Sequence, residues 1–133
     1  CLVGSEMCIR DRHNNYQLSV SLRNDSQGLD IVCGFDLRFN EKNKFQILKL
    51  VSSINAQIWL GHFDVWDKEG LIIYRNSSII DRNNLNLENV ETLLLDAVNS
   101  IDLYFPAFQY ILWAGKTSEE ALSTVLFETR GEA

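Results

Sequence analysis

The chain has 133 residues, which is the usual size of a single domain and leaves room for one hydrophobic core. Its hydrophobic fraction of 46% and charged fraction of 23% are those of ordinary globular proteins, so the composition excludes a disordered or fibrous chain. The formal net charge of −6 repels phosphate groups, and the chain has no basic stripe, so we expect it to bind neither nucleic acid nor membranes.

The cysteines and the hydropathy pattern narrow the class of protein further. The three cysteines, Cys1, Cys8 and Cys33, are odd in number and lack the spacing of a disulfide framework or a zinc site. Cys33 falls in an apolar pattern, where we expect a small buried thiol. No apolar run approaches the roughly 18 residues of a membrane span. The sequence therefore predicts a soluble cytoplasmic protein with no metal and no cofactor.

Residues 1–12 differ in pattern from the rest of the chain. They show neither the period of two that marks a strand nor the period of 3.6 that marks a helix, and they lack the parts of a secretory signal. They resemble the peptide that results when sequencing-adapter DNA is translated in frame with a truncated gene. We therefore expect residues 1–12 to be a non-native peptide and residues 13–133 to form a single domain.

Two alternating stretches predict a first hairpin. Apolar and polar residues alternate strictly over residues 16–22 and again over residues 29–39. Between the two stretches, residues 24–28 supply the polar and glycine residues of a turn. Two strands joined by so short a turn are expected to pair in the antiparallel direction.

A helix and a second hairpin follow. Asn40 is a suitable N-cap, and apolar residues at helical spacing predict a helix over residues 41–54. The stretches 58–66 and 71–80 flank a short loop that ends at Gly70, which predicts two further strands joined as a hairpin. The residues expected on the apolar face of the helix are Phe45, Ile47, Leu48, Val51 and Ile54.

The last third of the chain predicts helices. Asn86 can cap a helix, and Pro106 lacks the N–H that a helix interior requires, so we expect a break or kink just before the proline and a helical turn after it. Thr117 and Glu120 form a capping box for a last helix that should end near residue 128. The whole order predicts an α+β fold, an antiparallel sheet of two hairpins with helices packed on one face.

Two segments and the tail carry a resemblance to a known family. Trp59–Trp66 and Tyr104–Lys116 resemble the most recognisable stretches of alphaproteobacterial YbjN-domain proteins, and residues 119–133 fit the same pattern. The resemblance implies a bacterial sensory transduction regulator with the fold of type III secretion chaperones: a helix, three strands, a second helix, two strands and a third helix. The first helix and first strand of that fold have no counterpart in residues 13–133, which would leave a four-stranded sheet with an uncovered edge.

Aromatic residues concentrate in the family-like segments, and aromatic anchors dominate the energy of many protein interfaces. Both faces of the predicted strand 58–66 carry large apolar side chains. We expect one face to pack against helices and the other to meet a protein partner, the chain's own last helix or an identical subunit. The candidate partner-binding residues are Trp59, His62, Phe63, Trp66, Tyr104, Phe108 and Trp113.

No motif of nucleophilic catalysis, phosphate binding or dinucleotide binding occurs in the sequence. We therefore expect a non-enzymatic regulatory or chaperone-like module that binds a protein partner on its sheet face or edge, with a homodimer as one arrangement. His62 and Asp64 share a strand face, which is typical of a structural histidine and also of a group that responds to pH. The alternative function is a small-ligand or pH sensor, or an unrecognised enzyme, with a pocket near His62, Asp64 and Trp66.

Overall fold

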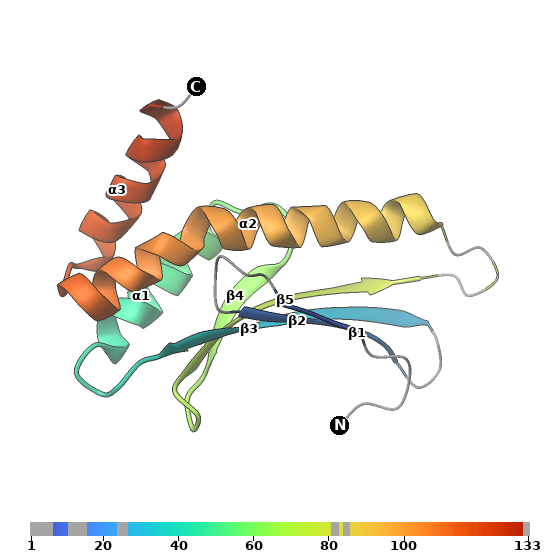
Figure 1. Ribbon diagram of the computed structural model, residues 1–133, viewed down its shortest axis with the longest axis horizontal. Coiled ribbons are helices and arrows are strands. Elements are labelled where there is room, and N and C mark those ends of the chain that lie inside the picture. The colour runs from blue at the N-terminus through green and yellow to red at the C-terminus, as the bar shows by residue number, and fades with distance from the viewer. Residues whose placement is uncertain (1–6, 11–15, 24–26, 81–82, 84–85, 132–133) are drawn as a thin grey trace.

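The computed structural model describes residues 7–10, 16–23, 27–80, 83 and 86–131. Over these residues the chain forms a five-stranded antiparallel sheet, in the order β1-β2-β3-β5-β4, and three α-helices. Helix α2 runs along one face of the sheet, and α1 and α3 gather near its C-terminal end (Figure 1). The predicted α+β class is confirmed. The elements are β1 (Met7–Arg10), β2 (Tyr16–Leu22), β3 (Gly28–Arg38), α1 (Lys44–Asn55), β4 (His62–Trp66), β5 (Leu71–Ile79), α2 (Leu87–Ala114) and α3 (Ser118–Gly131).

Alternation of apolar and polar residues turns one face of the sheet toward the core. Strands β2 and β3 form the predicted hairpin, in which Leu18 lies opposite Cys33. Both side chains are at most 1% exposed, so the expectation of a buried thiol is confirmed. Burial also raises the pKa of Cys33 to about 12. Strand β3 then pairs with β5, which joins the two hairpins into one sheet.

The sheet has a strand that we did not expect from the sequence. Strand β1 pairs with β2 in a register that places Met7 opposite Val20. This pairing uses backbone N–H and C=O groups, so it needs no apolar period in the added strand. The prediction of a four-stranded sheet is therefore wrong. The non-native origin of residues 1–12 stays a prediction.

Helix α1 begins later than predicted, and only part of its expected apolar face is buried: Ile47, Val51 and Ile54 pack as predicted. Asn40 caps the turn before it, because its side-chain oxygen accepts hydrogen bonds from the N–H groups of Lys42 and Asn43, at 3.0 and 3.3 Å. Phe45 and Leu48, which we expected to pack, are exposed. The spacing of the apolar residues allows two overlapping stripes. Contact with β4 and α3 buries the stripe that contains Leu50 and leaves Phe45 and Leu48 outside it. The buried residues are Ile47, Leu50, Val51 and Ile54.

Strand β4 begins at His62, later than predicted. Gly61 has a φ of 73°, a left-handed conformation that interrupts extended backbone. A side chain at Gly61 would collide with the hydroxyl of buried Tyr74, so the chain must pass close to the core here. Trp59 therefore lies in the connection before β4 and on neither face of a strand. The predicted hairpin of β4 and β5 is confirmed.

We expected a break or a kink near Pro106, and the break is wrong, because α2 continues through the proline as one helix. Proline removes one N–H from the helix and costs roughly 3 kcal/mol in a helix interior. The neighbouring Phe105 and Phe108 are at most 3% exposed, and burial of the two rings contributes roughly 1.5–3 kcal/mol each, which outweighs the loss. The predicted N-cap is confirmed, since the side-chain oxygen of Asn86 accepts from the N–H of Glu88 at 2.9 Å.

Helix α3 starts with the two residues of the predicted capping box, of which Thr117 caps the N–H of Glu120, and it ends at Gly131, a little beyond the predicted end. The hydroxyl of Thr117 donates to the carboxylate of Glu120 at 3.0 Å and accepts from the N–H of the same residue at 3.3 Å. Ala121 and Val125 are buried, and α3 contacts both α1 and α2.

The centre of the core is a group of aromatic rings around Phe63. The ring of Phe63 has its centroid between 5.4 and 6.0 Å from four others, which belong to β3, β5 and α2. Three of the four contacts are edge-to-face, the arrangement that aromatic pairs favour. The four rings are those of Phe35, Tyr74, Tyr104 and Phe108.

An ion pair between α1 and α3 makes stability depend on pH. Lys49 Nζ lies 2.7 Å from Glu119 Oε1, and this hydrogen bond is the main reason why the pKa of Glu119 is lowered from 4.5 to about 2. Because the folded-state pKa lies below the unfolded one, the pair stabilises the fold above pH 4.5 and loses this effect as the pH falls toward 2. In urea denaturation, we expect Glu119→Gln to be less stable than the wild type at neutral pH and to approach it in acid.

Lys49→Met provides the matched test of this pair. It should cause a similar loss at neutral pH, and combining it with Glu119→Gln should add little, because both variants remove one interaction. A deficit of Glu119→Gln that persisted unchanged at the acid end of the series would contradict the assignment.

Candidate functional site

The predicted partner-binding residues fall into two groups. Phe63, Tyr104 and Phe108 are at most 5% exposed, and the rings of Tyr104 and Phe108 both contact that of Phe63. Rings in this position cannot reach a partner while the domain is folded, so their assignment to a binding surface is wrong. A binding role for the others stays a prediction. The exposed members are Trp59, His62, Trp66 and Trp113.

His62, Asp64 and Trp66 lie on the face of β4 that points away from the helices, and all three are exposed. Apart from Trp66 this face of β4 is polar, whereas we expected large apolar groups on both faces. None of the three residues lines either of the two cavities described below. A ligand or pH sensor at this position stays a prediction.

The outer edge of β4 is closed by side chains. The amide of Asn55, at the end of α1, donates to the carbonyl of Phe63 at 2.9 Å and accepts from its N–H at 2.8 Å. The carboxylate of Asp64 accepts from the N–H of Val65 at 2.8 Å. These bonds occupy backbone groups that would otherwise be free to pair with another strand. Asp64 therefore has a structural role at this edge.

Strand β5 has an open edge near its C-terminus. Strand β4 pairs with β5 only as far as Arg75, whereas β3 pairs with the opposite side of β5 as far as Ile79. Within the described residues, the rest of β5 thus has a strand on one side only. The N–H of Ile80 donates to the carbonyl of Gln27 at 2.9 Å. Since backbone groups alternate along a strand, the N–H and C=O of Ser77 and Ile79 point to the open edge.

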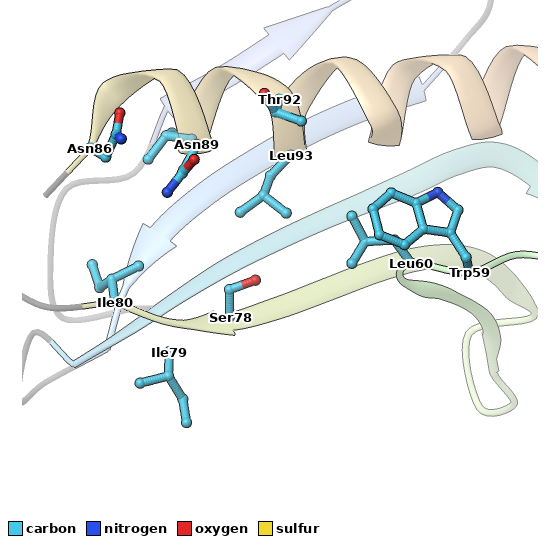
Figure 2. A pocket seen from close by; sticks show the side chains of 10 residues that line it. Trp59, Leu60, Ser78, Ile79, Ile80, Asn86, Asn89, Thr92 and Leu93 are labelled. Carbon is cyan, nitrogen blue, oxygen red and sulfur yellow. The ribbon is translucent and has the colours of Figure 1, made fainter.

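A cavity of about 490 Å³ lies between this open edge and the N-terminal half of α2. In Figure 2, Leu93 comes down from α2 and Ile80 comes up from the chain after β5, while Trp59 and Leu60 close one end. The side chain of Ile79 points away from α2, so this residue borders the cavity through its backbone (Figure 2). We call the cavity the α2 groove. Its lining residues include Trp59, Leu60, Ser78, Ile80, Asn89 and Leu93.

Three polar side chains, those of Tyr74, Asn76 and Asp96, lie beyond the inner end of the α2 groove. Asn76 is two residues before Ser78 on the same face of β5, and Asp96 is one turn after Leu93 on α2. Burial, followed by the negative charge of Asp96, raises the pKa of Tyr74 to about 12. Asn76 Nδ2 and Asp96 Oδ2 are buried, and neither atom has a hydrogen-bond partner among the described residues.

On the opposite face of the sheet, the two arginines near the open edge both lie beside Asp30, and Arg75 Nε has no hydrogen-bond partner among the described residues. Arg23 Nε lies 3.2 Å from Asp30 Oδ2, and Arg75 Nη2 lies 3.8 Å from Asp30 Oδ1. The hydroxyl of Ser77 donates to the same carboxylate. A second cavity, of about 290 Å³, is lined by Arg23 and Ser77 and by the end of β5. The two cavities thus lie on opposite faces of the sheet at the same strand end.

Fold and site together define an α+β protein whose sheet is covered by helices on one face and which has an open strand edge beside a groove. A family model described as "YbjN: Putative bacterial sensory transduction regulator" matches residues 4–110. The chain therefore belongs to the YbjN family. The match covers all five strands and most of α2, while α3 lies beyond it. The family is described as a regulator and not as an enzyme.

A solved structure is similar to this chain. It is titled "Crystal structure of YbjN, a putative transcription regulator from E. coli", and the likeness covers 92% of this chain and 78% of that one, with 10% identity and a TM-score of 0.56. At this identity the likeness shows the fold. None of the curated proteins matches the chain.

The described residues contain neither a helix suited to cross a membrane nor a metal-ligand cluster. No helix among them is both long and apolar enough to span a bilayer. Within the same part of the chain, no three His, Cys, Asp or Glu side chains come together as ligands would.

Sequence reasoning missed the open edge and the polar groups near it. The sequence does indicate one of these polar groups. Asp96 interrupts an apolar helical stripe that includes Leu93, Ala97 and Ile101. An acidic residue in such a stripe is either placed beside a partner or exposed by a turn of the helix. The open edge left no comparable signal, because it depends on where β4 begins.

Proposed function

We propose that this chain is a non-enzymatic regulatory module of the bacterial cytoplasm that binds an extended segment of a protein partner along the open edge of β5. The observation that carries the proposal is that β4 stops pairing at Arg75 while β5 continues to Ile79, beside the α2 groove. Membership of a family described as regulators supports the same function.

Strand addition gives this proposal its physical basis. An added segment would form main-chain hydrogen bonds with Ser77 and Ile79, whose backbone groups point outward. Its side chains would alternate between the α2 groove and the opposite face of the sheet. Trp59, which is 80% exposed at the end of the groove, would be covered by such a segment and act as an aromatic anchor.

The other edges of the sheet are less suited to this role. On the outer edge of β4, both backbone groups of Phe63 are bonded to Asn55 and the N–H of Val65 is bonded to Asp64. At the other end of the sheet the edge strand is β1, whose residues do not line the α2 groove. A second copy of the chain is one protein that fits the β5 edge, since two such strands related by a two-fold axis would pair in the antiparallel direction. A homodimer of this kind would compete with any other partner for the same edge.

We expect Ile79→Pro to abolish binding of an extended peptide. Proline removes the N–H that points to the open edge and leaves the N–H of Ile80, which bonds to Gln27, in place. Short peptides would be selected with the wild-type protein from a displayed random library, and their affinities for wild type and variant would be measured by calorimetry. Circular dichroism would show that the variant is folded.

Ile79→Ala is the matched control. It keeps the outward N–H and removes only side-chain contacts on the opposite face of the sheet, so it should bind the selected peptides far more tightly than Ile79→Pro does. The proposal fails if the library yields no peptide that binds the wild type, or if Ile79→Pro binds the selected peptides as tightly as Ile79→Ala does.

A further inference from the structure

A carboxylate oxygen without a counter-charge lies one helical turn beyond the α2 groove. Asp96 Oδ2 is buried, and Asp96 takes part in none of the ion pairs that the described residues form. Its polar neighbour Tyr74 interacts through its hydroxyl with both Asp96 and Asn76, but it carries no positive charge to offset the carboxylate. A buried carboxylate oxygen that lacks donors is costly, because it has lost water without gaining a partner.

A second unpaired group faces the same place from the sheet. Asn76 is 5% exposed, and its Nδ2 has no hydrogen-bond partner among the described residues. Most buried polar groups in native proteins are paired, so two unpaired groups on neighbouring elements need an explanation. One is an acceptor on α2 and the other is a donor on β5. Together they point to a polar group that enters from outside the chain.

Access to these two groups runs along the α2 groove. Ser78 and Leu93 line the groove, and Asn76 and Asp96 are the next residues along the same faces of β5 and α2. A segment paired with the open edge of β5 would direct alternate side chains under α2. A long side chain from such a segment has the reach to pass Leu93 and arrive at Asp96.

We propose that the segment bound along β5 inserts a lysine or arginine side chain into the inner end of the α2 groove, where its cationic group pairs with Asp96. A carbonyl oxygen of the same segment accepts a hydrogen bond from Asn76. This inference rests on the proposed function and names the chemistry of the partner: an extended protein segment with a basic residue at a groove-facing position.

The charges around the groove favour a cation over an anion. The chain has a net charge of −6, and the exposed Glu88 and Glu91 lie on the same half of α2. The arginines near the open edge are on the opposite face and are paired with Asp30. The negative charge of the chain thus attracts a basic segment at long range, and Asp96 pairs with its basic side chain at short range. An acidic side chain in the same place would be repelled by Asp96.

The test varies one position of a selected peptide. Each groove-facing residue of the tightest-binding peptide is replaced in turn by Lys, Gln and Glu, and binding is measured by calorimetry. At one of these positions we expect the wild type to bind the Lys peptide about tenfold more tightly than the Gln peptide, and the Glu peptide least tightly. In Asp96→Asn, the preference for Lys over Gln should disappear.

Glu91→Gln is the matched control, because it removes the same charge from the exposed side of α2. It should retain the preference for Lys. Equal affinity of the wild type for the Lys and Gln peptides would overturn the inference. So would a preference that Asp96→Asn keeps, or one that Glu91→Gln loses to the same extent, since a long-range effect does not need Asp96.

These outcomes are separate from those of the proposed function, which fails only if no peptide binds or if Ile79→Pro has no effect. Asp96→Asn is close to isosteric, so we expect it to fold. If it does not fold, the wild-type protein alone decides: addition of salt must weaken the Lys peptide more than the Gln peptide, and equal weakening overturns the inference.

Discussion

Replacing Phe63 by alanine is expected to lower the free energy of unfolding by about 3–5 kcal/mol. The side chain is 1% exposed, and its ring contacts four other rings from β3, β5 and α2. Alanine would leave a cavity that these rings cannot fill, because they belong to three different packed elements. A domain of this size has a total stability of roughly 5–15 kcal/mol, so the variant should be close to unfolding in urea at room temperature.

Trp66→Ala provides the control on the same strand. Trp66 lies on the opposite face of β4 and is 47% exposed, so its loss should cost less than about 1 kcal/mol. If Phe63→Ala does not fold, Phe63→Leu keeps part of the ring volume and makes the loss measurable. A midpoint for Phe63→Ala no lower than that of Trp66→Ala would mean that Phe63 does not hold the core.

Much of the fold could be predicted from the sequence, because the spacing of apolar residues and the residues that cap helices depend only on neighbours in the chain. The alternation of β2 and β3, the Asn86 cap and the Thr117 box each depend on residues close together in the chain. The exceptions depend on distant contacts. Helix α2 survives Pro106 because the flanking rings are buried against the sheet, and α1 selects its inner face from two stripes that its spacing allows.

The candidate site was harder to predict for the same reason. The concentration of aromatic residues pointed to both Phe63 and Trp59. The alternation of the sequence alone could not separate Phe63, whose ring fills the core, from Trp59, whose ring is exposed beside the groove. That division follows from Gly61, whose left-handed conformation takes Trp59 out of the strand. The same glycine fixes the start of β4 and thereby leaves the end of β5 open.

The second large effect is expected at the turn between β4 and β5, where Gly70→Ala should cost about 2–4 kcal/mol. Gly70 has a φ of 66°, and an added Cβ would lie 2.7 Å from the carbonyl oxygen of Phe39. The two backbones cannot separate easily. The N–H of Phe39 donates to the carbonyl of Gly70 at 2.9 Å, and Arg38 Nη1 donates to the carbonyl of Glu69 at 2.8 Å.

Two other glycines separate the two causes of this loss. Gly115 has a φ of 65° but nothing within 4 Å of an added Cβ, so Gly115→Ala should show the conformational cost alone, about 1–2 kcal/mol. Gly34 in β3 has neither a positive φ nor a close neighbour, so Gly34→Ala should change stability by less than about 0.5 kcal/mol. Urea denaturation of the three variants should therefore rank Gly70→Ala below Gly115→Ala and Gly115→Ala below Gly34→Ala. Equal losses of stability at Gly70 and Gly115 would show that the backbone of Phe39 can move aside. The turn between β4 and β5 would then be less rigid than its hydrogen bonds to Arg38 and Phe39 indicate.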